Sequence, residues 1–301
     1  MINQPINLNI ITCGTLSLGV KYTMNSGENS VDLVSDGTLM IDGGTAFGQV
    51  PRIEWETQIK PDRRNRIRIG MNSMLIKTPD SNILVDTGAG SKRIDTLKET
   101  HHINGNKLTR NMKELGLSTR DIDIVLLTHL HFDHSGGCTK LTRSGDAIPI
   151  YPNARYIIQQ DCWESALNPS ERYQSTFFHE DFLPLEKSNQ LELVRGDKDI
   201  THSVKVKMTG GPSKGHQVIF VNLGSEKLVF AGDLIPTPYH LQPECISAVD
   251  EFPNDTLVQK KELLDMIMKD GWIIVFSHGQ DQRSGYVEEW KGKPHLLPKE
   301  I

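Results

Sequence analysis

Four side chains that can bind a metal ion stand within six positions of one another: His129, His131, Asp133 and His134. They belong to the stretch T-H-L-H-F-D-H-S-G-G at 128–137, which follows an apolar run that predicts a buried strand. Side chains two residues apart at a strand end point the same way, so His129 and His131 can bind one ion. Imidazole nitrogens with carboxylate oxygens suit zinc, iron or manganese.

The residues after the motif permit a sharp turn, because Ser135, Gly136 and Gly137 favour one. Such a turn directs Asp133 and His134 toward a second position beside the first. A solvated histidine-rich loop or a pair of core histidines would explain the same residues without a metal. Four potential ligands at ligand spacing rarely fall together by accident, however, and the sequence therefore predicts a metal site.

Two further candidate ligands follow apolar strands elsewhere in the chain. Asp233 ends the run A-G-D after the predicted strand 227–230, and His278 lies in S-H-G after the predicted strand 272–276. A lone aspartate or histidine at such a place is usually a helix cap or a buried hydrogen-bonding group. Here the dense motif already implies a metal that needs more ligands, so we predict that both bind it.

A buried acid is also expected at Asp86, which ends the predicted strand 82–86 and needs a partner there. It either orients a metal-bound histidine from behind or caps the predicted helix 91–100. The sequence leaves both roles open.

The composition is that of a globular protein. The 301 residues are 37% hydrophobic and 24% charged, enough for one large domain or two small ones. The formal net charge of -5 argues against a nucleic-acid-binding surface driven by bulk charge. No stretch approaches the ~18 apolar residues of a membrane-spanning helix, so neither nucleic acid nor a membrane is an expected partner.

The cysteines are far apart and form no C-x-x-C pair, which disfavours both a disulfide framework and a thiolate zinc site; they are Cys13, Cys138, Cys162 and Cys245. The first residues lack the basic and apolar regions of a signal peptide. We therefore expect a cytoplasmic enzyme.

The order of predicted elements indicates two packed sheets with helices outside, in one domain. Strands are expected at 6–13, 67–78, 82–86, 122–127, 154–159, 191–194, 204–208, 217–222, 227–230 and 272–276. Helices are expected at 91–100, 107–116, 160–167 and 256–269. Residues 14–59 are expected to form a long loop that lies on the surface or lines a pocket. Residues 168–190 are expected to be irregular, and they either cover the active site or pack beneath a loop.

The motif H-L-H-F-D-H, followed by A-G-D and S-H-G and preceded by I-L-V-D-T-G, resembles the metallo-β-lactamase superfamily. The resemblance extends from about Asn72 to His278. It implies an α+β fold, the four-layer αββα sandwich, with two metal ions. We expect one domain over 1–301, in which 1–65 is an N-terminal extension and loop packed on the sandwich.

The resemblance also assigns each candidate ligand. His129 and His131 match ligands of the first metal, and Asp233 matches the carboxylate that bridges both metals. The ligands of the second metal are matched by Asp133, His134 and His278. Asp86 matches an acid behind the site. The two divalent ions are expected to be zinc, with iron or manganese as alternatives.

One position departs from the family pattern, which usually reads G-H-T-x-G-H between the main motif and the bridging aspartate. Residues 211–216 read G-P-S-K-G-H here, and aligning the second Gly-His places Pro212 where the first metal usually has its third histidine. The first site is therefore one histidine short and is expected to be weakly occupied, unless His216 or another group moves in. His216 is an uncertain ligand, and a supporting role behind the site is the other interpretation.

Two cations close together lower the pKa of a bridging water and polarise the bond that the resulting hydroxide attacks. Asp133 could pass the proton to the leaving group. The segment D-G-G-x-A-F-G at 42–48 is most similar to the lactonase and organophosphate-hydrolase-like branch. The resemblance therefore implies a metallo-hydrolase that opens a lactone or cleaves an ester of a small molecule, like an acyl-homoserine lactonase. Tyr239 and His240 either donate a hydrogen bond to the carbonyl oxygen or are ordinary loop residues.

Other functions of the same fold remain alternatives. A phosphotriesterase or arylesterase, a thioesterase, and a descendant of little activity with a depleted first site are the main ones. A nuclease is disfavoured by the acidic charge, and a flavodiiron oxidoreductase would need a flavin domain. A homodimer is left open.

Overall fold

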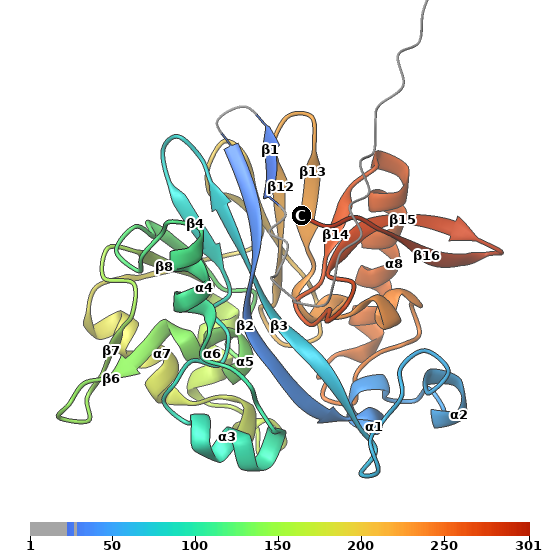
Figure 1. Cartoon of the computed structure of the whole chain (residues 1–301), viewed down its shortest axis with the longest axis horizontal. Helices are drawn as coiled ribbons and strands as arrows, with labels where there is room; N and C mark the ends of the chain where they lie inside the picture. Colours follow the sequence, from blue (N-terminus) through green and yellow to red (C-terminus); the bar gives the residue numbers. More distant parts are fainter. Residues whose placement is uncertain (1–22, 27–28) are drawn as a thin grey trace, which may run out of the picture.

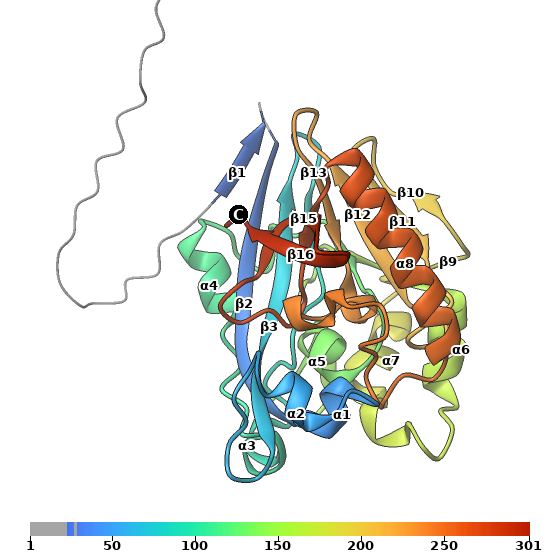
Figure 2. The ribbon, with the colours of Figure 1, turned by 90° about the vertical axis from the view of Figure 1, so that its right-hand side faces the viewer.

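Two seven-stranded sheets pack face to face in the part of the chain that this computed structural model describes, residues 23–26 and 29–301 (Figure 1). The predicted strand 6–13 lies outside the described residues. Helices cover the outer faces of both sheets (Figure 2). The structure thus confirms the αββα sandwich.

The first sheet changes from antiparallel to parallel along its width. Its strands pair antiparallel on one side and parallel from β4 onward. In spatial order they are β1 (Thr23–Ser26), β2 (Asn29–Asp42), β3 (Arg66–Lys77), β4 (Asn82–Val85), β5 (Ile124–Leu126), β8 (Arg155–Gln159) and β9 (Leu191–Val194).

The second sheet is antiparallel except where β13 and β14 run parallel. Its strands are β10 (Lys198–Asp199), β11 (Val204–Met208), β12 (Gln217–Asn222), β13 (Lys227–Phe230), β14 (Ile273–Val275), β15 (Ser284–Trp290) and β16 (Lys293–Pro298). A separate hairpin joins β6 (Thr139–Leu141) to β7 (Ala147–Pro149).

The helices lie on opposite sides of the sandwich. Leu263, Leu264 and Ile267 of α8 (Pro253–Asp270) pack on the outer face of the second sheet. Apolar residues of three helices cover the outer face of the first sheet: α4 (Leu108–Glu114), α6 (Gln160–Leu167) and α7 (His179–Lys187). Three short helices lie at the lower edge in Figure 1: α1 (Gly43–Phe47), α2 (Arg52–Trp55) and α3 (Ile94–His101). The helix α5 (Phe132–Ser135) lies further inside, near α6 and α7.

The central strands are apolar on both faces because each face is covered. In β4, Ile83 and Val85 face the layer between the sheets, whereas Leu84 faces the outer helices. The same alternation holds in β14, where Ile274 packs against α8 and its two neighbours point inward. Strands that read as continuous apolar runs in the sequence therefore mark the middle of the sandwich.

Two segments that were predicted to be loops contain strands or helices, so these two predictions are wrong. Residues 29–42 form the long strand β2, and 43–47 and 52–55 form short helices, although 14–59 was expected to be a loop. A bulge between Ser35 and Gly37 shifts the pairing with β3, so the alternation that would reveal a strand is broken. Residues 179–187 form α7, whose pattern is obscured by an internal Pro184 and by the absence of a side-chain cap at Phe178.

Three further expectations concern the cysteines, membrane-spanning helices and the number of domains. The cysteines within the described part, Cys138, Cys162 and Cys245, are free, as their spacing predicts, and all three are buried. Within the same residues, no helix is both long and apolar enough to cross a membrane. The single-domain interpretation, with 1–65 as an extension, stays a prediction.

The layer between the sheets should dominate stability. Phe230 is fully buried there, three residues before Asp233. We expect Phe230→Ala to lower the free energy of unfolding by about 3–5 kcal/mol, because it removes apolar contacts and leaves a cavity. Urea denaturation measures this. The control is Val258→Ala on α8, where the side chain is 50% exposed and the expected change is about 0.5 kcal/mol or less. Equal effects would contradict this account of the core.

Candidate metal centre

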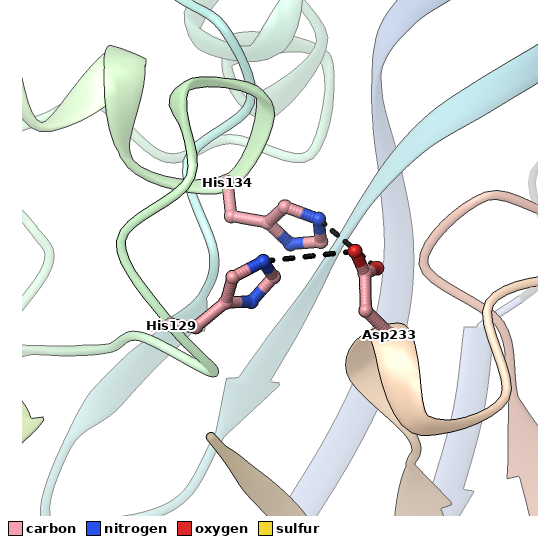
Figure 3. A group of neighbouring side chains, drawn as sticks. All are labelled: His129, His134 and Asp233. Atoms are coloured by element: carbon pink, nitrogen blue, oxygen red, sulfur yellow. Dashed lines mark ion pairs between the residues drawn. The ribbon is translucent and has the colours of Figure 1, made fainter. Parts of the chain in front are cut away.

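The predicted ligands meet at one edge of the sandwich, where strands of both sheets end. The motif residues follow β5, and the short helix α5 turns Asp133 and His134 back toward the strand end. Asp233 follows β13 and His278 follows β14, its parallel neighbour. In Figure 3, the rings of His129 and His134 both point toward the carboxylate of Asp233.

Four side chains surround one possible metal position, which matches the predicted second site. Oδ1 of Asp233 lies 3.2 Å from Nε2 of His134 and 3.1 Å from Nε2 of His278. Oδ2 of Asp133 lies 3.6 Å from Nε2 of His278. The ligand atoms of Asp133, His134 and His278 all lie within 4.8 Å of one another. Nitrogen and oxygen donors at this spacing fit a divalent transition metal.

The other oxygen of Asp233 faces the predicted first site. Its Oδ2 lies 3.6 Å from Nε2 of His129, and the rings of His129 and His131 are 4.4 Å apart. Nε2 of His129 and Nε2 of His131 are buried and have no hydrogen-bond partner among the described residues. A buried polar atom without a partner is costly, and a cation would provide one for both rings. The residues present therefore fit a metal here as well.

Hydrogen bonds at Nδ1 orient two of the candidate ligands, His134 and His278. Nδ1 of His134 lies 2.7 Å from Oδ2 of Asp86, and Nδ1 of His278 lies 2.7 Å from the carbonyl oxygen of Gly70. Each partner is an acceptor, so Nδ1 carries the proton and Nε2 keeps its lone pair for a metal.

Asp86 lies behind His134 and does not cap the following helix. Its Oδ1 accepts the backbone N–H of Thr128 at 2.8 Å, which ties the end of β4 to the start of the motif. Asp86 has a φ of 58°, in the left-handed region that non-glycine residues seldom occupy. Backbone strain of this kind clusters at functional sites.

The electrostatics of the cluster favour a cation between its members. Burial lowers the pKa of His129, and the neighbouring His134 and His131 lower it further, so this ring is neutral. Although burial opposes ionisation, His134 and His278 hold the pKa of Asp233 well below its usual value. The same contacts with Asp233 raise the pKa of His134 and of His278, although burial opposes this. A metal that binds the Nε2 atoms of these rings therefore takes the place of protons.

His216 supports the site and is not aimed into it. Its Nδ1 lies 2.8 Å from the hydroxyl of Thr209, and its Nε2 accepts the backbone N–H of Asp233 at 3.1 Å. Burial lowers the pKa of His216 to about 3, so the ring stays neutral and can accept that bond. Both ring nitrogens are thus engaged.

Of the two residues Tyr239 and His240, only His240 is among the residues that line the cavity in the described structure. His240 lines the cavity beside the ligands, but its Nε2 lies 2.9 Å from the carbonyl oxygen of Ala46 and its Nδ1 lies 2.7 Å from the hydroxyl of Thr237. Tyr239 is half-buried with its ring against Phe47. A hydrogen bond from Tyr239 to a substrate stays a prediction.

A cavity of about 600 Å³ opens above the ligands. His131, Asp133, Asp233 and His278 form part of its wall. Leu39 and Ile41 of β2 also line the cavity, within the segment that was expected to be a loop. Ser175 and Thr176 also line it, so the stretch 168–190 does border the site.

Two buried polar side chains that sequence reasoning missed hold the ligand loops. Nζ of Lys92 donates to the carbonyl oxygens of Gly136 at 2.5 Å and Thr139 at 2.8 Å, directly after the motif. Nδ2 of Asn72 donates to the carbonyl oxygens of Phe276 and Gly279, on either side of His278. Neither residue has a spacing or neighbour in the sequence that would reveal this contact.

At the strand ends of this αββα sandwich, histidines and aspartates form two adjacent groups that could hold metal ions. A family model described as the metallo-beta-lactamase superfamily matches residues 68–278. The chain belongs to the metallo-beta-lactamase superfamily and is a hydrolase of that superfamily, which confirms the resemblance and the fold predicted from the motifs.

The sequence identity to individual relatives is low. An N-acyl homoserine lactonase of Bacillus cereus is 26% identical over 234 residues, which cover 73% of this chain and 86% of the relative. The solved structure of a probable metal-dependent hydrolase from Staphylococcus aureus has a TM-score of 0.82 at 27% identity, covering 92% of this chain and all of that one. AidC, a dizinc quorum-quenching lactonase, has a TM-score of 0.78 at 20% identity, covering 93% and 98% of the two chains, and shows the fold alone.

The contact between Asp86 and His134 predicts a measurable effect on metal binding. In Asp86→Asn, the amide N–H faces Nδ1 of His134 and drives the proton to Nε2, which then cannot bind a metal. We expect zinc affinity to fall about 10–100-fold, measured by competition with a chromophoric chelator. Asp146→Asn, in the exposed β6–β7 turn, is the matched control. Wild-type affinity in Asp86→Asn would show that this contact does not orient the ligand.

Proposed function

We propose that this chain is a metal-dependent hydrolase that opens lactones or cleaves esters of small molecules, with an acyl-homoserine lactone as the leading substrate class. The observation that carries this proposal is a pair of adjacent His/Asp ligand groups beside a cavity of about 600 Å³. One group is His129, His134 and Asp233, and the other is Asp133, His134 and His278. The lactonase activity named for the curated relatives supports the choice of bond. Two zinc ions are the proposed cofactors, with iron or manganese as alternatives.

When bound, two divalent cations supply a water of lowered pKa and polarise the carbonyl that it attacks. The chain provides the ligands and a proton carrier. Asp133 lines the cavity with its side chain 16% exposed, so its carboxylate can reach a substrate above the second site. Asp133 is the proposed group that passes a proton to the leaving alcohol.

The cavity wall favours a substrate with an apolar part. Leu39, Ile41 and Ile69 of the first sheet supply aliphatic side chains, and Phe132 of the motif adds an aromatic ring. An acyl chain would bury its surface there at about 25 cal/mol per Å². Thr100 and Thr176 add polar groups to the same wall. This mixture suits an acyl chain joined to a polar ring.

Hydrolysis by the purified protein tests the proposal directly. We expect zinc-dependent turnover of acyl-homoserine lactones, lost with a chelator and restored by zinc. A panel that adds aryl esters, thioesters, phosphotriesters and β-lactams separates the related activities. Turnover of none of them would refute the proposal and favour a descendant of little activity.

The role of Asp133 gives a sharper prediction. We expect Asp133→Asn to lower kcat by about 10²–10⁴-fold, the usual value of a positioned proton carrier. The thermal unfolding temperature of the variant checks that the fold is retained. A kcat within a few-fold of wild type would exclude Asp133 from proton transfer.

A further inference from the structure

A basic segment of the chain borders the cavity that the candidate metal ligands share. Residues 60–68 carry five basic side chains and one acid. Two of the five, Arg64 and Arg66, line the cavity together with the aliphatic side chains of the first sheet. The proposed reaction gives a cation at this position no role, so the two arginines need a separate explanation.

The strand β3 connects the candidate metal site to this segment. At the metal site, the carbonyl oxygen of Gly70 lies 2.7 Å from Nδ1 of His278. Arg66 is four residues earlier in the same strand, a separation of about 13 Å at ~3.3 Å per residue. Between them, Ile69 pairs with Leu39 of β2, and both line the cavity. A substrate that extends from the metal site along this wall therefore meets aliphatic side chains first and arginine next.

The charge of Arg66 is compensated by an acid of the same turn. Its Nε and Nη2 donate to Oδ2 of Asp62 at 2.9 and 2.7 Å. The hydrogen bonds from this side chain lower the pKa of Asp62 to about 2, so the acid is ionised. Oδ1 of Asp62 accepts the backbone N–H groups of Arg64 and Arg66 at 2.8 and 2.9 Å. Both oxygens of Asp62 are thus engaged, and these bonds fix the backbone that carries Arg64.

The guanidinium group of Arg64 has no such partner. It forms no hydrogen bond or ion pair within residues 23–26 and 29–301, and its side chain is exposed. Asp42 is an acid on the same cavity wall, but its oxygens accept the backbone N–H of Thr45 and Nδ2 of Asn65, each at 3.0 Å. The donors of one guanidinium group on the cavity wall therefore remain for a ligand.

We propose that Arg64 binds an anionic group of the substrate, at the end remote from the bond that is cleaved. A guanidinium group pairs with a carboxylate through two parallel hydrogen bonds, so a terminal carboxylate is the group that fits best. The substrate class is then a lactone or ester whose acyl chain ends in a carboxylate. This inference rests on the hydrolase proposed above, and it names a part of the substrate that the metal ligands do not determine.

Binding of product analogues tests the inference without turnover. Two N-acyl-homoserines of equal chain length serve as probes, one whose chain ends in a carboxylate and one whose chain ends in a primary amide. Zinc-supplemented wild-type protein is titrated with each probe by calorimetry. We expect the carboxylate probe to bind about threefold to fivefold more tightly, which is the size of an ion pair at an exposed arginine. This preference should decrease at high salt, which screens the pair.

Three variants make the result specific. Arg64→Gln removes the charge and should bind both probes equally. Arg63→Gln removes the same charge from the exposed neighbour, which does not line the cavity within the described structure, and should keep the preference. Arg64→Lys keeps the charge but loses the two parallel bonds, so it should keep part of the preference. Thermal unfolding of each variant reports on folding.

Three results would overturn the inference: wild-type protein that binds both probes equally or binds neither, an Arg64→Gln variant that keeps the preference for the carboxylate, or an Arg63→Gln variant that loses it to the same extent. The failure of the proposed function is distinguishable. Binding that depends on Arg64, without hydrolysis of any compound in the panel, refutes the activity and leaves the anion subsite standing. Hydrolysis with equal affinity for the two probes refutes the subsite alone.

Discussion

The carboxylate of Asp233 is the group on which the arrangement of the whole site depends. One of its oxygens faces His129 and the other faces His134 and His278, so it joins ligands from two sheets. Its backbone N–H is held by His216. Because these atoms lie within a few ångströms, small errors in strand position would separate the two halves of the site. The sandwich must therefore be rigid at this edge.

That rigidity comes from close backbone contact around the motif. The turn after His134 approaches the segment after β4 so closely that a Cβ on Gly137 would lie 2.1 Å from the carbonyl oxygen of Thr87. The N–H of Thr87 in turn donates to the carbonyl oxygen of His134 at 2.7 Å. Glycine is required there by space. Lys92, fully buried and paired with Asp181, fixes the same turn from the other side.

The sequence was enough to predict those ligands whose position depends on neighbouring residues in the chain. Ligands at strand ends could be predicted because the strands β5, β13 and β14 are short apolar runs followed by Asp or His. The strand β2 could not be predicted in this way. Its bulge breaks the two-residue period, and its residues near the cavity are both polar and apolar.

Polar contacts between residues that are far apart in the chain could not be predicted from the sequence either. Asn72 reaches the His278 loop across 204 and 207 positions of the chain, and no local pattern encodes such a pair.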